Sequence, residues 1–288
     1  MRLDGKVAII TGSTRGLGRA FAQALVHAGA RVIINGTNPT RVAEVAASLG
    51  DAAVAVPGDV SHWATAERLT QTALDHFGRL DVLVNNAGTV ADRTLLKMSE
   101  EEFDRVIDVN LKGAFACARF AAQAMRDGDG GAIIGIVSNT GLRGGFGQTN
   151  YAASKAGVAG MLRTWAIELQ RYNIRVNGLW PVALTDMTQV LVDIETRTAQ
   201  QENRPAKTPQ QIGLGDVAQV APLIVYLASD ACTLNGQILA TNGTKIALWS
   251  HPTELVTIAR DGWTADTLAE AIPTHFADHW QTLGHPLV

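Results

Sequence analysis

Near the start of the chain stands Lys6-Val-Ala-Ile-Ile-Thr11-Gly12-Ser-Thr-Arg-Gly16-Leu-Gly18, the stretch that decides the fold. Its first part is a short, continuous apolar run, which predicts a strand buried on both faces of a parallel sheet. Apolar residues then recur every four positions from Gly16 to His27, and this spacing predicts a helix. The stretch is therefore expected to form a strand, a glycine-rich turn and a helix in succession.

The same alternation of strand and helix continues along the chain. Further strands are expected at Arg31–Asn35, Ala53–Val56, Leu80–Val84, Ala132–Val137, Ile174–Leu179 and, as the last strand, Gln237–Ala240. Helices are expected after the cap Asn38, at Ser61–Phe77, from Ser99 to about Arg126, at Tyr151–Gln170 and after the cap Asp216. Strict alternation implies right-handed crossovers, so the predicted fold class is α/β, a doubly wound, Rossmann-like parallel sheet with helices on both faces.

Two parts of the chain differ from this pattern. Residues 184–214 carry polar side chains and two prolines, and they resemble a mobile lid. Residues 246–288 are short for an independent core and include Trp249, Trp263 and Trp280. The prediction is a single dinucleotide-binding and catalytic domain, residues 1–245, with a C-terminal extension, residues 246–288, that packs on this domain or on a neighbouring subunit.

Composition excludes several classes of protein. Hydrophobic residues make up 47% and charged residues 18%, which excludes disordered and fibrous chains. The net charge of −3 lacks the basic excess of a nucleic-acid-binding protein, and no apolar run approaches the roughly 20 residues that span a bilayer. Cys117 and Cys232 stand in apolar surroundings and are expected to be reduced and buried, which favours a cytoplasmic protein.

The glycine-rich turn is the first candidate binding site. Glycines let a phosphate approach the backbone amides, and the N-terminus of the following helix favours negative charge. An ordinary glycine-rich turn is the alternative interpretation, but the order of strand, turn and helix favours a dinucleotide. The expected contacts are Gly12, Thr14, Arg15, Gly16, Leu17 and Gly18.

Three further motifs follow in order: Asn85-Asn86-Ala87-Gly88 after the fourth strand, Ser138 at the end of the fifth, and Tyr151-Ala-Ala-Ser-Lys155. Together with the glycine-rich turn, this ordered set resembles the short-chain dehydrogenase/reductase family, in its single-domain branch, over about residues 3–244. The motifs are most similar to those of 3-oxoacyl thioester (acyl-carrier-protein) reductases and related carbonyl reductases. The resemblance implies an NAD(P)(H)-dependent enzyme that reduces carbonyls or oxidises alcohols.

The residues Tyr151 and Lys155 support this chemistry by their spacing. They stand four apart on a predicted helix and therefore lie on one face. The ammonium favours the ionised phenol, although moving the phenol pKa from about 10 towards neutrality requires roughly 4 kcal/mol. Tyr151 is the expected general acid in reduction and base in oxidation, an effect worth about 10²–10⁴ in rate. A solvated Tyr–Lys pair is the alternative, which the accompanying motifs disfavour.

The resemblance also implies roles for other residues. Ser138 would donate a hydrogen bond to the substrate oxygen, Lys155 would also bind the nicotinamide ribose, and Asn110 would hold a water that links Lys155 to solvent. A strand-end hydroxyl is the alternative for Ser138, and an Asn that caps or kinks a helix is the alternative for Asn110. The implied cofactor contacts beyond the glycine-rich turn are Thr37, Asp59, Val60, Asn86, Ala87, Gly88, Tyr151, Lys155, Pro181 and Thr185.

Residues 181–185 depart from the family pattern. The family continues from its sixth strand with Pro-Gly and a Thr a few residues later. Here Val182 follows Pro181, and the stretch to Thr185 is one residue shorter. The seating of the nicotinamide is therefore left open by the sequence.

An absence indicates which dinucleotide is used. NAD-binding folds place an acidic side chain about 20 residues past the glycine-rich turn, where it accepts hydrogen bonds from the ribose 2′-hydroxyl. No Asp or Glu occurs between Gly18 and Arg41, whereas Arg15 offers a cation to a 2′-phosphate. NADP(H) is the predicted cofactor. The alternative is that Arg15 faces solvent and that NAD(H) is accepted as well.

The loop at residues 141–147 is expected to border the substrate. Phe146 would provide an apolar wall and Arg143 an anion anchor, and ordinary loop chemistry is the alternative for each. Ser138, Phe146 and Tyr151 are the candidate substrate-binding residues. His275 and His279 have a spacing that could chelate zinc, but no further ligands accompany them in the sequence, so no metal is expected.

The helix around residues 114–122 is apolar or small nearly all round, which predicts a homo-oligomer, a dimer or a tetramer. The predicted function is hydride transfer between NADP(H) and a ketone or secondary alcohol, with a 3-oxoacyl thioester as the candidate substrate. An NAD-linked secondary-alcohol or sugar dehydrogenase is one alternative. A dinucleotide-binding sensor without catalysis is another, against which the complete Ser-Tyr-Lys set argues.

Overall fold

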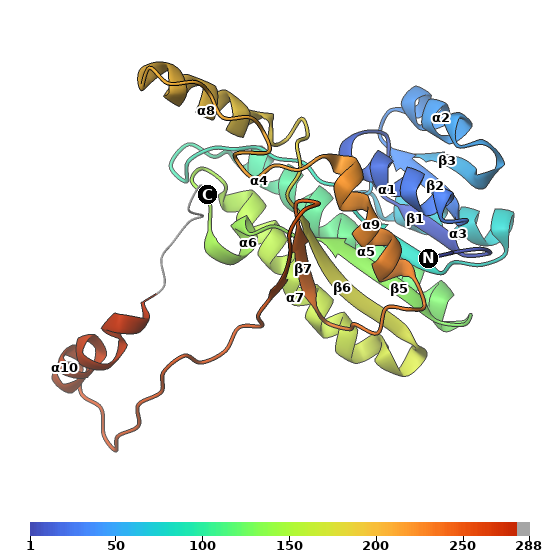
Figure 1. Cartoon of the computed structure of the whole chain (residues 1–288). Coiled ribbons are helices and arrows are strands. Elements are labelled where there is room, and N and C mark those ends of the chain that lie inside the picture. Colours follow the sequence, from blue (N-terminus) through green and yellow to red (C-terminus); the bar gives the residue numbers. More distant parts are fainter. Residues whose placement is uncertain (281–288) are drawn as a thin grey trace.

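The computed structural model describes residues 1–280, and in this part of the chain the strands form one eight-stranded sheet (Figure 1). The strands lie in the order β3-β2-β1-β4-β5-β6-β7-β8. Their bounds are β1 Val7–Ile10, β2 Arg31–Gly36, β3 Ala53–Pro57, β4 Val82–Asn85, β5 Gly131–Ile136, β6 Ile174–Pro181, β7 Ile238–Thr241 and β8 Ile246–Trp249. The first seven strands are parallel, which confirms the predicted doubly wound α/β sheet.

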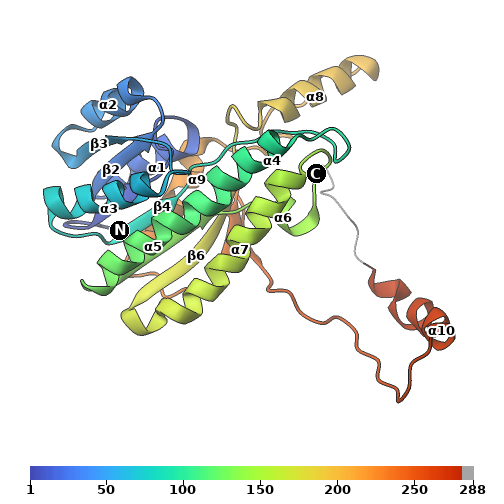
Figure 2. The same cartoon turned by 180° about the vertical axis from the view of Figure 1, so that it is seen from behind.

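Helices cover both faces of the sheet (Figures 1 and 2). One hydrophobic cluster joins the sheet to α1, α2 and α9, and a second joins its other face to α3, α5 and α7. The helices are α1 Gly16–His27, α2 Pro39–Ser48, α3 Trp63–Phe77, α4 Glu100–Ile107, α5 Gly113–Arg126, α6 Thr140–Arg143, α7 Thr149–Leu169, α8 Gln189–Gln201, α9 Val217–Ala228 and α10 Ala265–Phe276.

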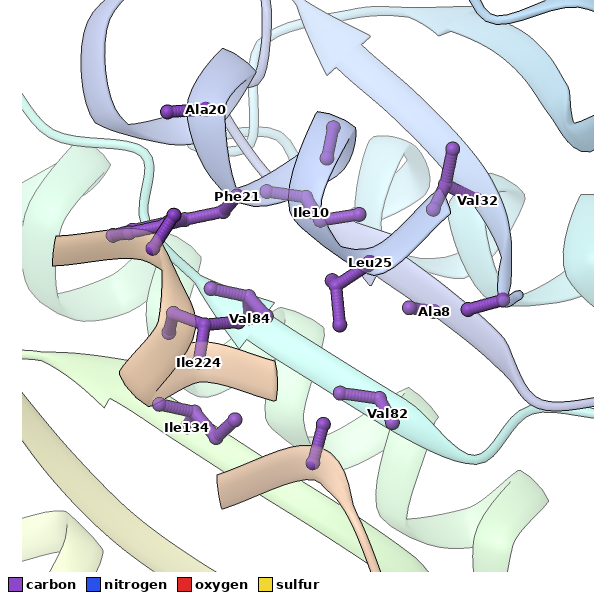
Figure 3. Packing of buried hydrophobic residues seen from close by; sticks show 14 of the residues in the cluster. Ala8, Ile10, Ala20, Phe21, Leu25, Val32, Val82, Val84, Ile134 and Ile224 are labelled. Carbon is purple, nitrogen blue, oxygen red and sulfur yellow. The ribbon is translucent and has the colours of Figure 1, made fainter. Parts of the chain in front are cut away.

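The first cluster fixes the helix that follows the glycine-rich turn. Figure 3 shows Phe21 and Leu25 of α1 packed beside Ile224 of α9, over Ile10 of β1 and Val84 of β4. All five side chains are fully buried. Burial of a side chain of this size contributes about 1.5–3 kcal/mol. The apolar positions four apart on α1 therefore hold the helix against β1, and its N-terminus is fixed above the carboxyl end of the sheet.

The predicted helix starts are confirmed by their caps. The side chain of Asn38 accepts a hydrogen bond from the backbone of α2 at 3.0 Å. Ser99 and Glu102 form the reciprocal capping box at the start of α4, and Asp216 caps α9. These residues satisfy backbone N–H groups that a helix end leaves unpaired.

The long helix predicted from Ser99 to about Arg126 is found, but it is not α-helical throughout. Between α4 and α5 the chain forms a π-helical turn, Asp108–Lys112, which contains the buried Asn110. No proline lies within residues 108–112, so the sequence shows no break at this turn. Such turns occur frequently at functional sites.

The strand predicted at residues 237–240 is confirmed as β7, but it is not the last strand. β8 pairs antiparallel with β7, and the hairpin is closed by Asn242, whose Oδ1 accepts the N–H groups of Thr244 and Lys245 at 3.1 and 2.9 Å. Trp249 of β8 packs on Trp180 with ring centres 5.0 Å apart. β8 is a short edge strand with mostly exposed side chains, so its sequence is not that of a buried strand. The first residues of the predicted extension therefore belong to the sheet.

Beyond β8 the chain leads away from the sheet. Arg163 Nε donates to His251 Nδ1 at 3.1 Å, close to the start of this segment. The helix α10 contains no buried residue, and both views place it apart from the domain (Figures 1 and 2). What the extension packs against, and the domain boundary at residue 245, stay predictions; residues 281–288 lie outside the described part.

The segment predicted to be a lid, residues 184–214, is partly helical. It contains α8, and the chain that returns from this helix is joined to it by Arg204, whose Nη1 lies 2.6 Å from Glu195 Oε1. The guanidinium of Arg204 lowers the pKa of Glu195 to about 2. The mobility of this segment stays a prediction.

Two other expectations concern single residues and helices. Cys117 and Cys232 are buried free thiols. Within residues 1–280, no helix combines the length and the apolar character that crossing a membrane requires.

Candidate active site

The sheet has a point at which a ligand crevice is expected. From β1 the chain proceeds outwards to β2 and β3, and it then returns to β4 on the other side of β1. In open α/β sheets, ligands bind at the carboxyl ends of the strands where the order reverses in this way. The glycine-rich turn after β1 and the Asn86–Gly88 segment after β4 both stand at this point.

Close contacts require two glycines of the turn. A Cβ atom at Gly12 would lie 2.9 Å from Cα of Ala87, and one at Gly18 would lie 2.5 Å from Nδ2 of Asn86. The turn therefore packs directly on the residues that follow β4. Gly16 differs, because its φ is +51° and nothing lies nearer than 3.8 Å to an added Cβ. Its backbone faces the crevice.

The start of α1 is suited to an anion. Arg15 stands at the N-cap but makes no side-chain cap hydrogen bond, and the first turn of α1 holds no acidic side chain. The first N–H groups of the helix and the positive end of its dipole are thus available to a phosphate. Leu17 packs against the hydrophobic cluster below and anchors the turn. These residues fit the pyrophosphate of a dinucleotide.

Thr11, which sequence analysis did not single out, holds the two loops together. Its Oγ1 accepts the N–H groups of Asn86 and Ala87 at 3.0 and 2.9 Å. The amide of Asn86 in turn donates to the carbonyl oxygens of Thr11 and Gly12 at 2.8 and 3.0 Å. The position of Thr11, immediately before the first glycine, was the available signal.

The residues expected near the adenosine lie at the ends of β2 and β3. A Cβ at Gly36 would lie 2.7 Å from Cγ2 of Thr14, so the glycine-rich turn reaches the end of β2. Thr37 follows directly and is exposed. After β3, Asp59 Oδ1 accepts a backbone N–H at 2.9 Å and Val60 is buried. Thr14, Thr37, Asp59 and Val60, which are predicted cofactor contacts, therefore lie along one side of the expected crevice.

The segment after β6 forms the other side of the crevice. Val182, which stands where the family has a glycine, continues the sheet by donating its N–H to the carbonyl oxygen of Thr241 at 2.8 Å. Pro181 ends β6. Thr185 lies close to the glycine-rich turn, since its Cγ2 is the atom nearest to an added Cβ at Gly16. The shorter stretch therefore still brings Thr185 beside the glycine-rich turn, and its contact with the cofactor stays a prediction.

The three side chains predicted to be catalytic lie together. Ser138 follows β5, whereas Tyr151 and Lys155 lie one turn apart on α7. The phenol of Tyr151 is hydrogen-bonded to Ser138. Nζ of Lys155 lies 5.7 Å from the centre of the Tyr151 ring and donates to the carbonyl oxygen of Ile136 at 2.7 Å.

Asn110 connects the loop after β4 to α7. Its Oδ1 accepts the N–H of Thr89 at 2.8 Å, and its Nδ2 donates to the Thr89 carbonyl at 3.0 Å and to Ser154 Oγ at 3.2 Å. Ser154 Oγ donates to the carbonyl oxygen of Tyr151 at 2.8 Å. Gly88 lies beside this side chain, since a Cβ there would be in ordinary van der Waals contact with Asn110 Oδ1 at 3.5 Å. Sequence analysis missed Ser154, because a serine within a helix carries no signal of its own. The expected role of Asn110 in holding a water stays a prediction.

Burial dominates the acid–base properties of the site. It raises the pKa of Tyr151 above 10, while the hydrogen bond with Ser138 lowers this pKa and the carboxylate of Asp92 raises it. Burial also lowers the pKa of Lys155 from 10.5 to about 8. The expected lowering of the phenol pKa by Lys155 is not seen in this structure, because weakly polar surroundings disfavour the charged form of each group. At neutral pH the phenol is protonated and the amine is mostly charged.

A polar rim that sequence analysis missed stands beside these groups. Gln148 Nε2 donates to Asp92 Oδ2 at 3.1 Å, and Thr140 Oγ1 donates to Gln148 Oε1 at 3.4 Å. The N–H of Arg93 donates to the carbonyl oxygen of Gly147 at 2.8 Å. These bonds join the loop after β4 to the loop before α7, two segments whose sequence separation concealed their contact.

The structure does not bring every residue that was expected near the substrate into one site. Phe146 is 94% exposed, so its side chain projects into solvent and its role as an apolar wall stays a prediction. Arg143 lies at the end of α6, and its role as an anion anchor stays a prediction. His275 and His279 are exposed, and no group of three or more potential metal ligands occurs within residues 1–280.

Known proteins resemble this chain along most of its length. The family model described as short chain dehydrogenase matches residues 6–196. A hydroxyacyl-CoA dehydrogenase of Mycobacterium tuberculosis is 37% identical, over 96% of this chain and 90% of that protein. A 3-oxoacyl-(acyl-carrier-protein) reductase of Vibrio cholerae is also 37% identical, over 84% of this chain and 98% of that protein.

Solved structures show the same similarity. A short chain dehydrogenase from Mycobacterium avium superposes with a TM-score of 0.79 at 34% identity, covering 99% of this chain and 100% of that one. A gluconate 5-dehydrogenase from Burkholderia cenocepacia, in complex with NADP and tartrate, gives a TM-score of 0.76 at 32% identity, with 84% and 95% covered. By its sheet, its ordered motifs and these relatives, the chain belongs to the short-chain dehydrogenase family and is an NAD(P)-dependent oxidoreductase acting on CH–OH or C=O groups.

Proposed function

We propose that the protein reduces a 3-oxoacyl thioester, or a ketone of similar shape, with NADP(H). The observation that supports this chemistry most directly is the grouping of three side chains: the phenol of Tyr151 is hydrogen-bonded to Ser138, and Nζ of Lys155 lies 5.7 Å from the centre of the Tyr151 ring. A neutral phenol at physiological pH is a proton donor, which carbonyl reduction requires.

In the proposed mechanism, Ser138 donates a hydrogen bond to the carbonyl oxygen of the substrate and stabilises the negative charge that develops there. Tyr151 Oη then transfers its proton to this oxygen as the C=O bond becomes a CH–OH bond. The buried ammonium of Lys155 stabilises the phenolate that remains. A hydride for the carbonyl carbon is the chemistry that the bound dinucleotide supplies.

Three observations support NADP(H) as the cofactor. The chain lacks an acidic residue between Gly18 and Arg41, Arg15 stands in the glycine-rich turn, and Thr37 is exposed at the end of β2. The gluconate 5-dehydrogenase that this chain resembles was solved with NADP. NAD(H) is the alternative cofactor.

The substrate proposal draws on the relatives. Reductases of 3-oxoacyl-(acyl-carrier-protein) match 84% of this chain, and the hydroxyacyl-CoA dehydrogenase matches 96%. The second match reaches into the extension beyond β8, which favours a coenzyme A thioester. A sugar-acid dehydrogenase is the second candidate, favoured by the gluconate 5-dehydrogenase structure.

A panel of substrates tests this proposal. Acetoacetyl-CoA, a simple ketone and a keto sugar acid are each assayed with NADPH and with NADH by the loss of absorbance of the reduced nicotinamide. The thioester with NADPH is expected to give the highest kcat/KM. A higher value for the sugar acid would favour the second candidate, and binding of dinucleotide without any turnover would favour a sensor.

The acid–base properties predict a pH profile. The pKa of Lys155 is about 8, so its amine loses its positive charge as the pH rises through this value. The stabilisation of the phenolate is then lost, and kcat/KM for reduction is expected to fall above about pH 8. Initial rates at subsaturating substrate between pH 6 and pH 10 measure this fall, and a profile that is flat to pH 10 would contradict it.

We also propose that the chain forms a homo-oligomer. On the side of α3 and α5, the rings of Trp63 and Phe115 pack 5.8 Å apart yet are about 40% exposed, and Ile167 of α7 is also exposed. Exposed clusters of this kind mark interaction surfaces. Light scattering after gel filtration at micromolar concentration is expected to give a multiple of the monomer mass, whereas a monomer would reject the proposal. The two buried free thiols support the cytoplasm as the location.

A further inference from the structure

An ion pair crosses the mouth of the proposed dinucleotide crevice. Nη1 of Arg15, in the glycine-rich turn, lies 2.7 Å from Oδ2 of Asp186, in the segment after β6. These residues are 171 positions apart in sequence. A second contact shows independently that the two segments adjoin, since Thr185 Cγ2 lies 3.8 Å from the position of a Cβ at Gly16.

The acidic partner of this pair is presented by a fixed turn. Thr188 Oγ1 donates to the carbonyl oxygen of Ala183 at 2.8 Å and accepts the N–H of Thr185 at the same distance. The hydroxyls of Thr185 and Thr188 are also bonded to each other at 3.2 Å. The backbone that carries Asp186 is therefore braced, while its carboxylate is 79% exposed and pairs with Arg15.

The basic partner has a long, exposed side chain. The side chain of Arg15 is 71% exposed, and within residues 1–280 Asp186 is its single ion-pair partner. Its backbone neighbour Thr14 lies against Gly36, at the end of β2, where the 2′-phosphate of NADP(H) is expected. The guanidinium of Arg15 therefore has two anionic groups that it could pair with: the carboxylate of Asp186 on one side of the expected crevice and the 2′-phosphate on the other.

We propose that Asp186 is a cofactor-specificity residue that lowers the affinity for NADP(H) by competing with the 2′-phosphate for Arg15. The inference rests on the proposed NADP(H) function. A phosphate dianion offers Arg a stronger, bidentate partner than one exposed carboxylate, so NADP(H) displaces Asp186. Because exposed ion pairs are weak, the penalty corresponds to about a two- to fivefold loss of affinity. Asp186 also repels the pyrophosphate, but this effect is common to NADH and NADPH.

The experiment separates competition from general repulsion. Dissociation constants for NADPH and NADH are measured by titration calorimetry for the wild type, Asp186→Asn, Arg15→Ala and the double variant. Asp186→Asn is expected to tighten NADPH binding about two- to fivefold more than NADH binding. With Arg15→Ala already present, the same change should affect both dinucleotides equally, because no guanidinium remains to be released.

A matched control removes a charge from the same segment. Asp193 of α8 is bonded to Gln189 at 3.1 Å and does not contact the glycine-rich turn, so Asp193→Asn should leave the ratio of the two affinities unchanged. Asp186→Ser serves as a second variant, and circular dichroism checks that each variant is folded.

The other outcomes are distinguishable. Weaker NADPH binding in Asp186→Asn would show that Asp186 orients Arg15 for the phosphate, and an unchanged ratio would show no competition. Either result overturns the inference but leaves the proposed function intact, provided that Arg15→Ala abolishes the preference for NADPH. If Arg15→Ala leaves the preference unchanged, the proposed role of Arg15 fails and the inference fails with it.

Discussion

Replacement of Tyr151 by Phe is expected to lower kcat for carbonyl reduction by about 10²–10⁴-fold, the usual contribution of a positioned general acid. Phe retains the ring and its packing on α7 but cannot donate a proton or the hydrogen bond with Ser138. The dissociation constant of NADPH should change little, because the phenolic oxygen adds little to binding of a large dinucleotide. Single-turnover rates and calorimetric titration measure the two quantities separately.

Tyr226→Phe is the matched control. Tyr226 lies on α9, on the other side of the sheet from α7, so the loss of its hydroxyl should leave kcat unchanged. Retained turnover in Tyr151→Phe would contradict the mechanism, because some other group would then supply the proton.

Replacement of Lys155 by Met is expected to reduce activity and, at the same time, to stabilise the fold. Burial lowers the pKa of Lys155 from 10.5 to about 8, which at neutral pH corresponds to a penalty of about 3 kcal/mol for keeping the ammonium charged inside the protein. Met carries no charge and removes this penalty. The variant also loses the hydrogen bond to the carbonyl oxygen of Ile136, which destabilises it by about 1 kcal/mol. Urea unfolding at pH 7 should therefore show a gain of about 2 kcal/mol.

The pH dependence of this gain gives a sharper test. Below pH 8 both the folded and the unfolded wild type carry the charge, so the full penalty applies. Between pH 8 and 10.5 the folded lysine is already neutral while the unfolded one still binds its proton, so the wild type becomes relatively more stable. The advantage of the Met variant should shrink across this window. A variant that is less stable at pH 7 would contradict the penalty.

An exposed lysine provides the control. Lys112 is more than half exposed and pairs with Asp108 at 3.3 Å, so Lys112→Met should leave activity and unfolding free energy nearly unchanged. Active sites commonly keep a buried charge that is needed for the reaction, although this charge lowers the free energy of unfolding. The different results expected for Lys155→Met and Lys112→Met would show this effect.

Where the sequence carries local signals, it predicts the structure well. The first strand, turn and helix follow from an apolar run, three glycines and a repeat of four, and all three are found at β1, the turn and α1. Asn38, Ser99 and Asp216 mark helix starts because a cap depends only on residues within one turn of it. Tyr151 and Lys155 could be named in advance because they stand four apart on one helix, and Ser138 because the ordered motifs resemble those of a known family.

Elements without such signals were missed. β8 is an exposed edge strand whose pairing depends on β7, and no proline marks the π-helical turn at Asp108–Lys112 in the sequence. Ser154 and Gln148 gain their meaning from partners far away in sequence, Asn110 and Asp92. No pattern along the chain identifies such pairs.

The sequence by itself determined the seven parallel strands of the sheet and the glycine-rich turn, because each depends on periodicity or on neighbours in the chain. It also identified the candidate catalytic residues, through the order of motifs that resemble those of a known family. Only the tertiary structure decided the electrostatics: that burial raises the pKa of Tyr151 and lowers that of Lys155, and that Arg15 meets Asp186. Desolvation and ion pairing depend on which atoms surround a group in space. Those atoms come from segments as far apart as β1 and the turn after β6, and only folding brings them together.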